Sequence, residues 1–174
     1  MDHTALTGIA HLALYGPDGE LLHQDTVHNL ITDAGDLYYA TRGAAAVSPG
    51  GVTDATKVTG MKLGTGTTAP DKNGAAAELG GYISGSNNAF DSGYPQLNNL
   101  GADNGVEIVY QTTWAAGDAT NAAITEAVIV NDQSSDLTSD EADTISRITF
   151  TAVNKTASDT LVITWRHKFL GAGV

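Results

Sequence analysis

The side chains that could do chemistry in this chain are mainly carboxylates and imidazoles, and two groups of them stand close together in the sequence. The larger group is an acidic segment that contains Asp132, Asp136, Asp140, Glu141 and Asp143. Calcium prefers oxygen ligands such as these, but the ligand spacing and the central glycine of an EF-hand are missing. We therefore favour a solvated loop, with a calcium site as the alternative.

The smaller group is His23, Asp25 and His28. On a β-strand, His23 and Asp25 would share one face and His28 would lie on the other. This spacing fits no closed zinc site, in which four ligands surround the metal. We expect a chance surface cluster here, and no metal or other cofactor.

A glycine-rich segment, Gly64-Thr65-Gly66-Thr67-Thr68, resembles a phosphate-binding loop at first sight. A Walker loop needs Gly-Lys-Ser/Thr at the start of a helix, and a dinucleotide-binding loop needs a third glycine at a fixed spacing. Here Ala69-Pro70 follows instead, so we expect an ordinary loop.

Nucleophilic catalysis has no support in the sequence. The chain contains no cysteine, which excludes a thiolate nucleophile, a thiolate zinc site and disulfide bonds. Serines, histidines and aspartates are present, but they include no nucleophile elbow. We therefore expect a protein that is not an enzyme.

The charge balance argues against nucleic acid as a partner. With 20 acidic and 8 basic residues, the net charge of −12 repels phosphate backbones unless basic residues gather in a patch. The one small basic cluster is Arg166-His167-Lys168, which we interpret as the solvated face of a terminal strand. No apolar run approaches the ~20 residues of a membrane span, and the start of the chain lacks the features of a signal peptide. We expect synthesis in the cytoplasm, and no nucleic-acid or membrane partner.

Glycine-rich turns divide the 174 residues into short apolar runs, a pattern typical of all-β proteins. We predict a single domain, residues 1–174, folded as an antiparallel β-sandwich of jelly-roll-like form. The expected strands are 6–15, 20–27, 58–63, 106–114, 124–130, 144–153 and 160–169. Gly16-Pro17-Asp18-Gly19 should join the first two as a hairpin. One short helix is expected near residues 33–46, with Thr32 as its cap.

Alternation along the expected strands predicts which side chains form the core. The predicted core residues are Trp165, Ile163, Leu161, Ile108, Tyr110 and Ile124. Trp114 and Trp165 are also candidates for stacking on carbohydrate. Aromatic side chains on the apolar face of a strand are ordinarily packed inside, so we expect both tryptophans in the core.

The segment 80–105 is the longest expected loop, and it carries six large apolar side chains among its glycines and asparagines. They are Tyr82, Ile83, Phe90, Tyr94, Leu97 and Leu100. Two interpretations remain open: the segment folds back onto its own sandwich, or it is an arm that reaches a neighbouring subunit. The second predicts that these side chains bind a partner, because Tyr and Phe are enriched at interface cores.

Six short motifs occur in an order that resembles a group of small structural proteins of tailed bacteriophages. They are Asn29–Gly35, Met61–Pro70, Ala123–Ile129, Ile148–Phe150, Val153–Lys155 and Asp159–Trp165. The resemblance runs from about residue 29 to residue 168. The segment 80–105 departs from it, since the common members of the group lack an insertion of this length.

The resemblance implies a β-sandwich that decorates or cements a capsid shell and has no catalytic residues. Its partners would be the major capsid protein and further copies of the chain, as a dimer or trimer on the surface of the virion. A tail or fibre component and a receptor- or glycan-binding module are the alternatives. Copy number separates the virion roles, because a cement is present in hundreds of copies and a tail protein in a handful.

Overall fold

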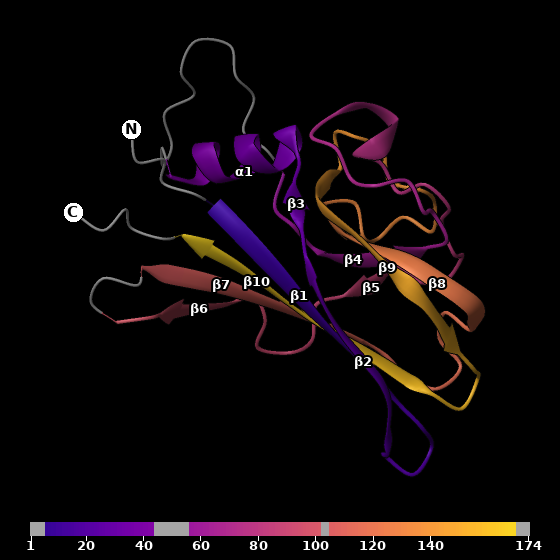
Figure 1. The fold of residues 1–174 in the computed structure, drawn as a ribbon. Helices are drawn as coiled ribbons and strands as arrows, with labels where there is room; N and C mark the ends of the chain where they lie inside the picture. Colours follow the sequence, from indigo (N-terminus) through magenta and orange to yellow (C-terminus); the bar gives the residue numbers. More distant parts are fainter. Residues whose placement is uncertain (1–5, 44–55, 102–104, 170–174) are drawn as a thin grey trace.

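The computed structural model of the chain describes residues 6–43, 56–101 and 105–169, which form two antiparallel five-stranded sheets and one α-helix (Figure 1). Sheet A has the strand order β2-β1-β10-β7-β6, and sheet B has the order β3-β9-β8-β4-β5. The strands of sheet A are β1 (Leu6–Tyr15), β2 (Leu21–His28), β6 (Gln96–Asn99), β7 (Val106–Trp114) and β10 (Thr160–Phe169). Those of sheet B are β3 (Leu30–Ile31), β4 (Gly60–Gly64), β5 (Asn88–Ala89), β8 (Asn121–Val130) and β9 (Thr144–Lys155).

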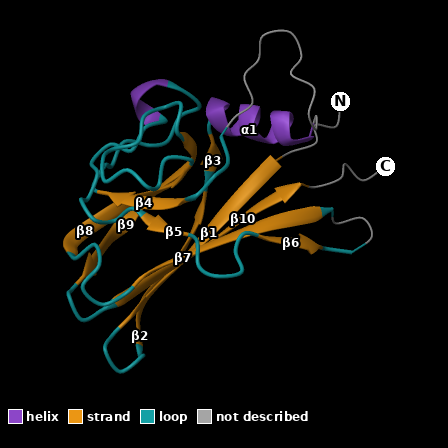
Figure 2. Ribbon diagram, turned by 180° about the vertical axis from the view of Figure 1, so that it is seen from behind, coloured by secondary structure: helices purple, strands orange, loops and turns teal. Residues whose placement is uncertain are grey.

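The two sheets share one large apolar core, so the predicted all-β sandwich is confirmed. Jelly-roll connectivity is not confirmed, because four pairs of consecutive strands are direct neighbours: β1–β2, β4–β5, β6–β7 and β8–β9. The helix, α1 (Asp33–Gly43), lies at one end of the sandwich, beside the ends of β1 and β10 (Figure 2). None of the helices in the described ranges is long and apolar enough to cross a membrane.

The N-terminal hairpin forms as the turn sequence predicts. Gly19 has φ +80°, which glycine adopts without strain, and Gly16 N–H donates to the Glu20 carbonyl at 2.9 Å. β1 then pairs with β2 on one side and with β10 on the other. The first strand therefore has a neighbour on both sides in sheet A, and β2 lies at the edge of the sheet.

Helix α1 begins at a side-chain cap and is held close to sheet B. The Thr32 hydroxyl accepts the N–H of Gly35 at 3.0 Å, and the acidic Asp33 and Asp36 lie in the first turn, where the helix dipole favours negative charge. Gly35 is required for this packing, because a Cβ there would lie 2.2 Å from the Ile145 carbonyl oxygen. The predicted helix is confirmed for 33–43, and 44–46 lie outside the described residues.

The chain passes from sheet A to sheet B at Asn29. β2 pairs with β1 up to His28, and β3 immediately pairs with β9, with Leu30 opposite Arg147. Beyond this point β2 and β9 diverge and leave an open groove of about 450 Å³, lined in part by Asp25, Val27 and Phe150.

The core prediction is largely confirmed. Leu161, Ile163, Trp165, Tyr110 and Ile124 are at most 1 % exposed. Ile108 is only partly buried and packs against the core from its margin. Trp114 is also fully buried, and its Nε1–H donates to the Ser86 carbonyl at 2.7 Å.

The segment 80–105 contributes to both sheets, which a simple connecting loop would not. Its β5 pairs with β4 in sheet B, and its β6 pairs with β7 in sheet A. The chain therefore crosses from one sheet to the other along this side of the sandwich. The sequence analysis did not predict these two strands, because they are only two and four residues long and carry no clear alternation.

Candidate docking surface

An apolar groove opens between the end of α1 and the strands β6, β7 and β10. It has a volume of about 420 Å³. We call it the β6 groove, and its lining consists of Tyr39, Arg42, Gly43, Leu97, Val106, Ile108 and Phe169. Leu97 is 72 % exposed and Val106 is 38 % exposed, although both are aliphatic. Such a cluster of exposed apolar side chains in one groove is typical of a binding surface.

Strand pairing brings the apolar side chains of the β6 groove together. Leu97 lies opposite Ile108 across β6 and β7, and Val106 lies opposite Phe169 across β7 and β10. Directly opposed side chains in antiparallel strands contact each other, so the two pairs form one continuous apolar surface. The Phe169 ring also meets the Tyr39 ring edge-on, with centroids 5.1 Å apart, which ties α1 to the sheet.

A buried polar network lies beneath this surface. The Tyr39 hydroxyl is hydrogen-bonded to His167 Nδ1 and lies 3.0 Å from the Tyr110 hydroxyl. On its other side, His167 Nε2 lies 3.1 Å from Asn29 Nδ2. Burial lowers the pKa of His167 to about 3 and raises the pKa of Tyr39. The network is therefore neutral near pH 7, and it orients Tyr39 at the groove.

The basic cluster interpretation was wrong for one residue. His167 is completely buried, as the alternation of β10 requires, and does not belong to a solvated face. Arg166 points to the other face and pairs with Glu107 at 2.6 Å. The neighbouring positions therefore supply an imidazole to the interior and a guanidinium to an ion pair, and they do not form a basic patch.

The structure does not bring the six predicted partner-binding side chains to one surface. Ile83 is buried in the main core, and the Phe90 ring packs 5.2 Å from the ring of Tyr110. Tyr82 packs against a second small core cluster. Tyr94 and Leu100 are partly buried, and Leu97 alone lines the β6 groove.

Sequence reasoning missed Tyr39, Arg42, Val106 and Phe169 as members of this surface. Val106 and Phe169 are the first and last residues of their strands, and Tyr39 is on the helix. The alternation of apolar residues along these strands is the same for a face that is buried in the core and for a face that lines a groove. Only the cover provided by neighbouring elements separates the two cases, and sequence periodicity does not report it.

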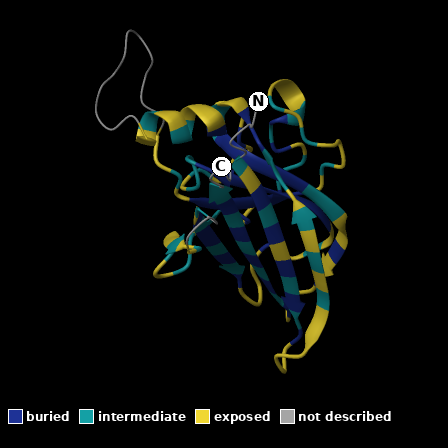
Figure 3. Cartoon of the chain, turned by 60° about the vertical axis from the view of Figure 1, so that its left-hand side comes forward, coloured by how far each residue is buried: buried dark blue, intermediate teal, exposed yellow. Residues whose placement is uncertain are grey.

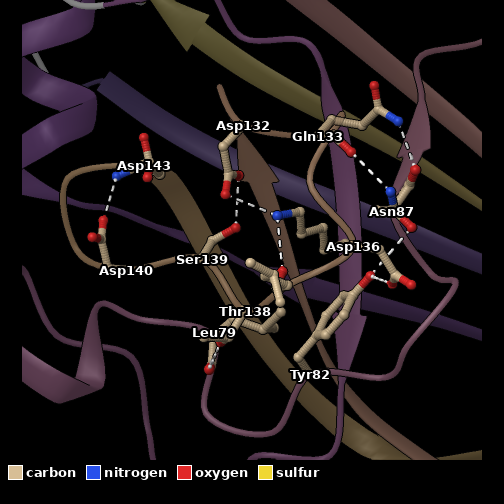
Figure 4. Close-up of polar contacts among 12 residues, drawn as sticks. Leu79, Tyr82, Asn87, Asp132, Gln133, Asp136, Thr138, Ser139, Asp140 and Asp143 are labelled. Atoms are coloured by element: carbon tan, nitrogen blue, oxygen red, sulfur yellow. Dashed lines mark hydrogen bonds and ion pairs between the residues drawn. The ribbon is translucent and has the colours of Figure 1, made fainter.

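The acidic segment 131–143 is tied down by hydrogen bonds and an ion pair (Figure 4). The ammonium of Lys62, which is completely buried, donates to Asp132 at 2.9 Å and to the Leu137 carbonyl at 3.0 Å. Asp132 also accepts the Ser139 hydroxyl at 2.7 Å. These bonds attach this part of the segment to a buried side chain of the sandwich, which the solvated-loop interpretation did not predict.

Asp136 is held by the segment 82–85. It accepts the Tyr82 hydroxyl at 2.5 Å and the N–H of Gly85 at 2.8 Å, and the Tyr82 bond lowers the pKa of Asp136. Burial and the neighbouring Asp132 and Asp140 raise the pKa of Asp143. Across the described residues, His, Asp and Glu form no group of three that could hold a metal ion, and this includes the acidic segment and His23, Asp25 and His28.

The glycine-rich segment 64–68 surrounds a carboxylate of the chain itself. Glu126 accepts the N–H groups of Gly66 at 2.7 Å and Gly81 at 2.8 Å, and Arg147 Nη2 donates to it at 2.8 Å. A Cβ on Gly64 would lie 2.3 Å from Glu126 Oε1, so the glycine is required by this contact. Within the segment the N–H of Gly66 faces an anion, as in a phosphate loop, and that anion is the carboxylate of Glu126.

Comparisons with protein-family models, with curated proteins and with solved structures give no match. The function of the chain is therefore inferred from the sequence resemblance and from the geometry of the β6 groove.

Proposed function

We propose that the chain is a structural protein of a tailed-bacteriophage particle. In this proposal it is a decoration protein that binds the major capsid protein through the β6 groove and stabilises the head. The groove is the observation that carries the proposal, because it brings the exposed Leu97 and Val106 together with the half-buried Phe169 at the margin of a sandwich. The phage resemblance of residues 29–168 supplies the identity of the particle.

The chemistry of the groove suits a protein partner. Interface cores are enriched in aromatic residues and arginine and depleted in other charged residues. The groove combines the rings of Tyr39 and Phe169 with the guanidinium of Arg42. The net charge of −12 adds attraction to a basic partner surface over a longer range. Repetition of modest contacts over a symmetric shell would supply stability through avidity.

The alternatives in the same particle are a tail or fibre component, and outside it a receptor- or glycan-binding module. Burial of both tryptophans favours the decoration role over glycan binding, since neither ring is available for stacking on a sugar. Copy number discriminates the roles within the particle. Quantitative gel densitometry of purified particles should give hundreds of copies, and a handful would indicate a tail or fibre protein.

A substitution pair tests the groove itself. Leu97→Asp places a charge in the groove, whereas Leu137→Asp changes an equally exposed leucine in the acidic segment, at 68 % exposure. We expect Leu97→Asp to fold and to lose binding to particles that lack the protein, and Leu137→Asp to bind as the unmodified chain does. Cosedimentation with such particles measures this. Equal binding of both variants would remove the β6 groove as the capsid contact.

A further inference from the structure

β2 is an edge strand, and it is longer than the other three edge strands of the two sheets. It has eight residues, pairs with β1 along one side, and has no strand on the other side among the residues that the structure describes. The edge strands β3 and β5 have two residues each, and β6 has four. Short edges resist pairing with another chain, whereas a long open edge is a template for it. The hairpin of β1 and β2 extends from the sandwich, with many exposed residues in β2 (Figure 3).

The hydrogen bonds of the hairpin fix which backbone groups point outward. Asn29 N–H donates to the Gly8 carbonyl at 3.1 Å, so Asn29 faces β1. The direction of the backbone N–H and C=O groups alternates from one residue to the next along an antiparallel strand. The backbone groups of His23, Asp25 and Val27 therefore also point toward β1. Those of Gln24 and Thr26 point away from it. An independent contact agrees, because Thr26 N–H donates at 2.7 Å to the side chain of Asp25 and not to β1.

The sequence of β2 does little to protect this edge. It contains no lysine and no proline, which are the usual residues that block edge pairing. Leu21 and Leu22 are 50 % and 51 % exposed. The carboxylate of Asp25 covers one outward N–H group, that of Thr26. A partner strand would need to displace only this local contact.

The edge is complementary to a second copy of itself. When two copies of β2 pair antiparallel, residues whose backbone groups point outward must lie opposite each other. A twofold axis through Gln24 meets this requirement. In this register His23 lies opposite Asp25 of the second copy, twice by symmetry. The alternative axis at Asp25 would oppose two carboxylates, which is destabilising. Avoidance of two opposed carboxylates therefore selects the axis at Gln24.

Two further features of the edge fit this register. His23 Nε2 is buried and has no hydrogen-bond partner among the described residues, and the pairing places a carboxylate beside His23. The groove between β2 and β9 leaves space for the partner strand beside Asp25 and Val27, with Phe150 on its far wall. The exposed Leu22 of the second copy would lie opposite Thr26, at this groove.

We propose that the chain forms a homodimer by antiparallel pairing of β2 with β2 of a second copy, about a twofold axis at Gln24. The pairing joins the two copies of sheet A into one continuous sheet. It does not rest on the proposed function, since the β6 groove lies at the opposite edge of sheet A. Both surfaces can therefore be occupied at once.

Cysteine cross-linking tests the register, because the chain has no cysteine of its own. A hydrogen-bonded pair of residues has Cα atoms about 5.5 Å apart, within the range for a disulfide, so Gln24→Cys should cross-link to itself. Thr26→Cys is the matched control, because its two copies would lie four residues, or ~13 Å, apart. On mild oxidation of the full chain, we expect at least about tenfold more covalent dimer from Gln24→Cys. No cross-linking, or equal cross-linking of both variants, would overturn the proposal.

A charge exchange tests the contact between the two copies. His23→Asp places two carboxylates opposite each other and should raise the dissociation constant of the dimer about tenfold, as measured by analytical ultracentrifugation. The double variant His23→Asp with Asp25→His restores opposite partners and should restore the dimer. Leu97→Asp, at the other edge of the sheet, should remain dimeric. A monomeric unmodified chain, or a double variant as weak as the single one, would refute β2 pairing.

Discussion

The two sheets differ in how far other parts of the chain cover their outer faces and in how long their edge strands are. In β10 of sheet A, buried and half-buried residues alternate, so one face is turned to solvent (Figure 3). In β8 of sheet B, every residue from Ile124 to Val130 is buried, because loops cover the outer face as well. The edges follow the same division: sheet B ends in strands of two residues, and sheet A ends in β2 and β6.

Buried charges hold the cover of sheet B in place. Lys62, Glu126 and Arg147 come from three adjacent strands and are at most 1 % exposed. Each bonds to groups in the covering loops, such as the Leu137 carbonyl for Lys62 and the Thr68 carbonyl for Arg147. Sheet B therefore satisfies its buried charged groups within the chain, whereas sheet A leaves its two edges open among the described residues.

The largest expected effect comes from breaking the ion pair under the loops. Arg147→Met leaves Glu126 as an uncompensated buried charge and removes the donors to the Thr68 and Ala76 carbonyls. We expect a loss of about 3–5 kcal/mol in the free energy of unfolding, measured in urea. Lys72→Met, which breaks a half-exposed pair with Asp36, should cost about 0–1 kcal/mol. Equal losses in the two variants would show that the buried ion pair stabilises the fold no more than the half-exposed ion pair does.

The two tryptophans test whether hydrogen bonding or side-chain volume has the larger effect on stability in the shared core. Both are fully buried, but Trp114 donates to the Ser86 carbonyl and Trp165 Nε1 has no partner among the described residues. Replacement by phenylalanine removes similar volume in each case. Trp114→Phe should cost about 1 kcal/mol more than Trp165→Phe, because it removes a buried hydrogen bond, although the Ser86 carbonyl keeps the N–H of Asn88 at 3.0 Å. Urea unfolding of both variants measures the difference, and a larger loss for Trp165→Phe would contradict it.

Acidification tests the neutral network at the end of sheet A. Burial holds the pKa of His167 at about 3, below its value of about 6.5 in an unfolded chain. The folded form therefore binds no proton at this site where the unfolded form does, and stability is full above pH 6.5 and is lost as pH falls toward 3. At pH 5 the loss from His167 is about 2 kcal/mol. The variant His167→Gln should show a flatter dependence between pH 7.5 and pH 5, and an unchanged slope would contradict the assignment.

Strand positions were predictable because alternation and turn chemistry are local. The hairpin at Gly16–Gly19, the run Val106–Trp114 and the alternation of Thr160–Phe169 all appear as expected. The cap at Thr32 was also readable, since Thr followed by acidic residues is a local signal.

The polar interior of sheet B was not predictable in this way. Lysine and arginine are ordinarily exposed, so the sequence alone gives no reason to place Lys62 and Arg147 inside. Their burial depends on Asp132 and Glu126, which are distant in sequence. The β6 groove has the same origin, since it needs α1, β6 and β10 to meet. Contacts of this kind have no local signature.

The smallest expected effect on stability concerns Leu97, which distinguishes a surface kept for a partner from one that supports the fold. Its side chain is 72 % exposed, so Leu97→Ser removes little buried area and should change the free energy of unfolding by less than about 0.5 kcal/mol. Leu63→Ser, at a wholly buried leucine of β4, should cost several times as much because it leaves a cavity and a buried hydroxyl. Urea unfolding of both variants measures this. A cost above about 1 kcal/mol for Leu97→Ser would mean that the leucine supports the sandwich, and the argument that the β6 groove is held open for a partner would lose its main residue.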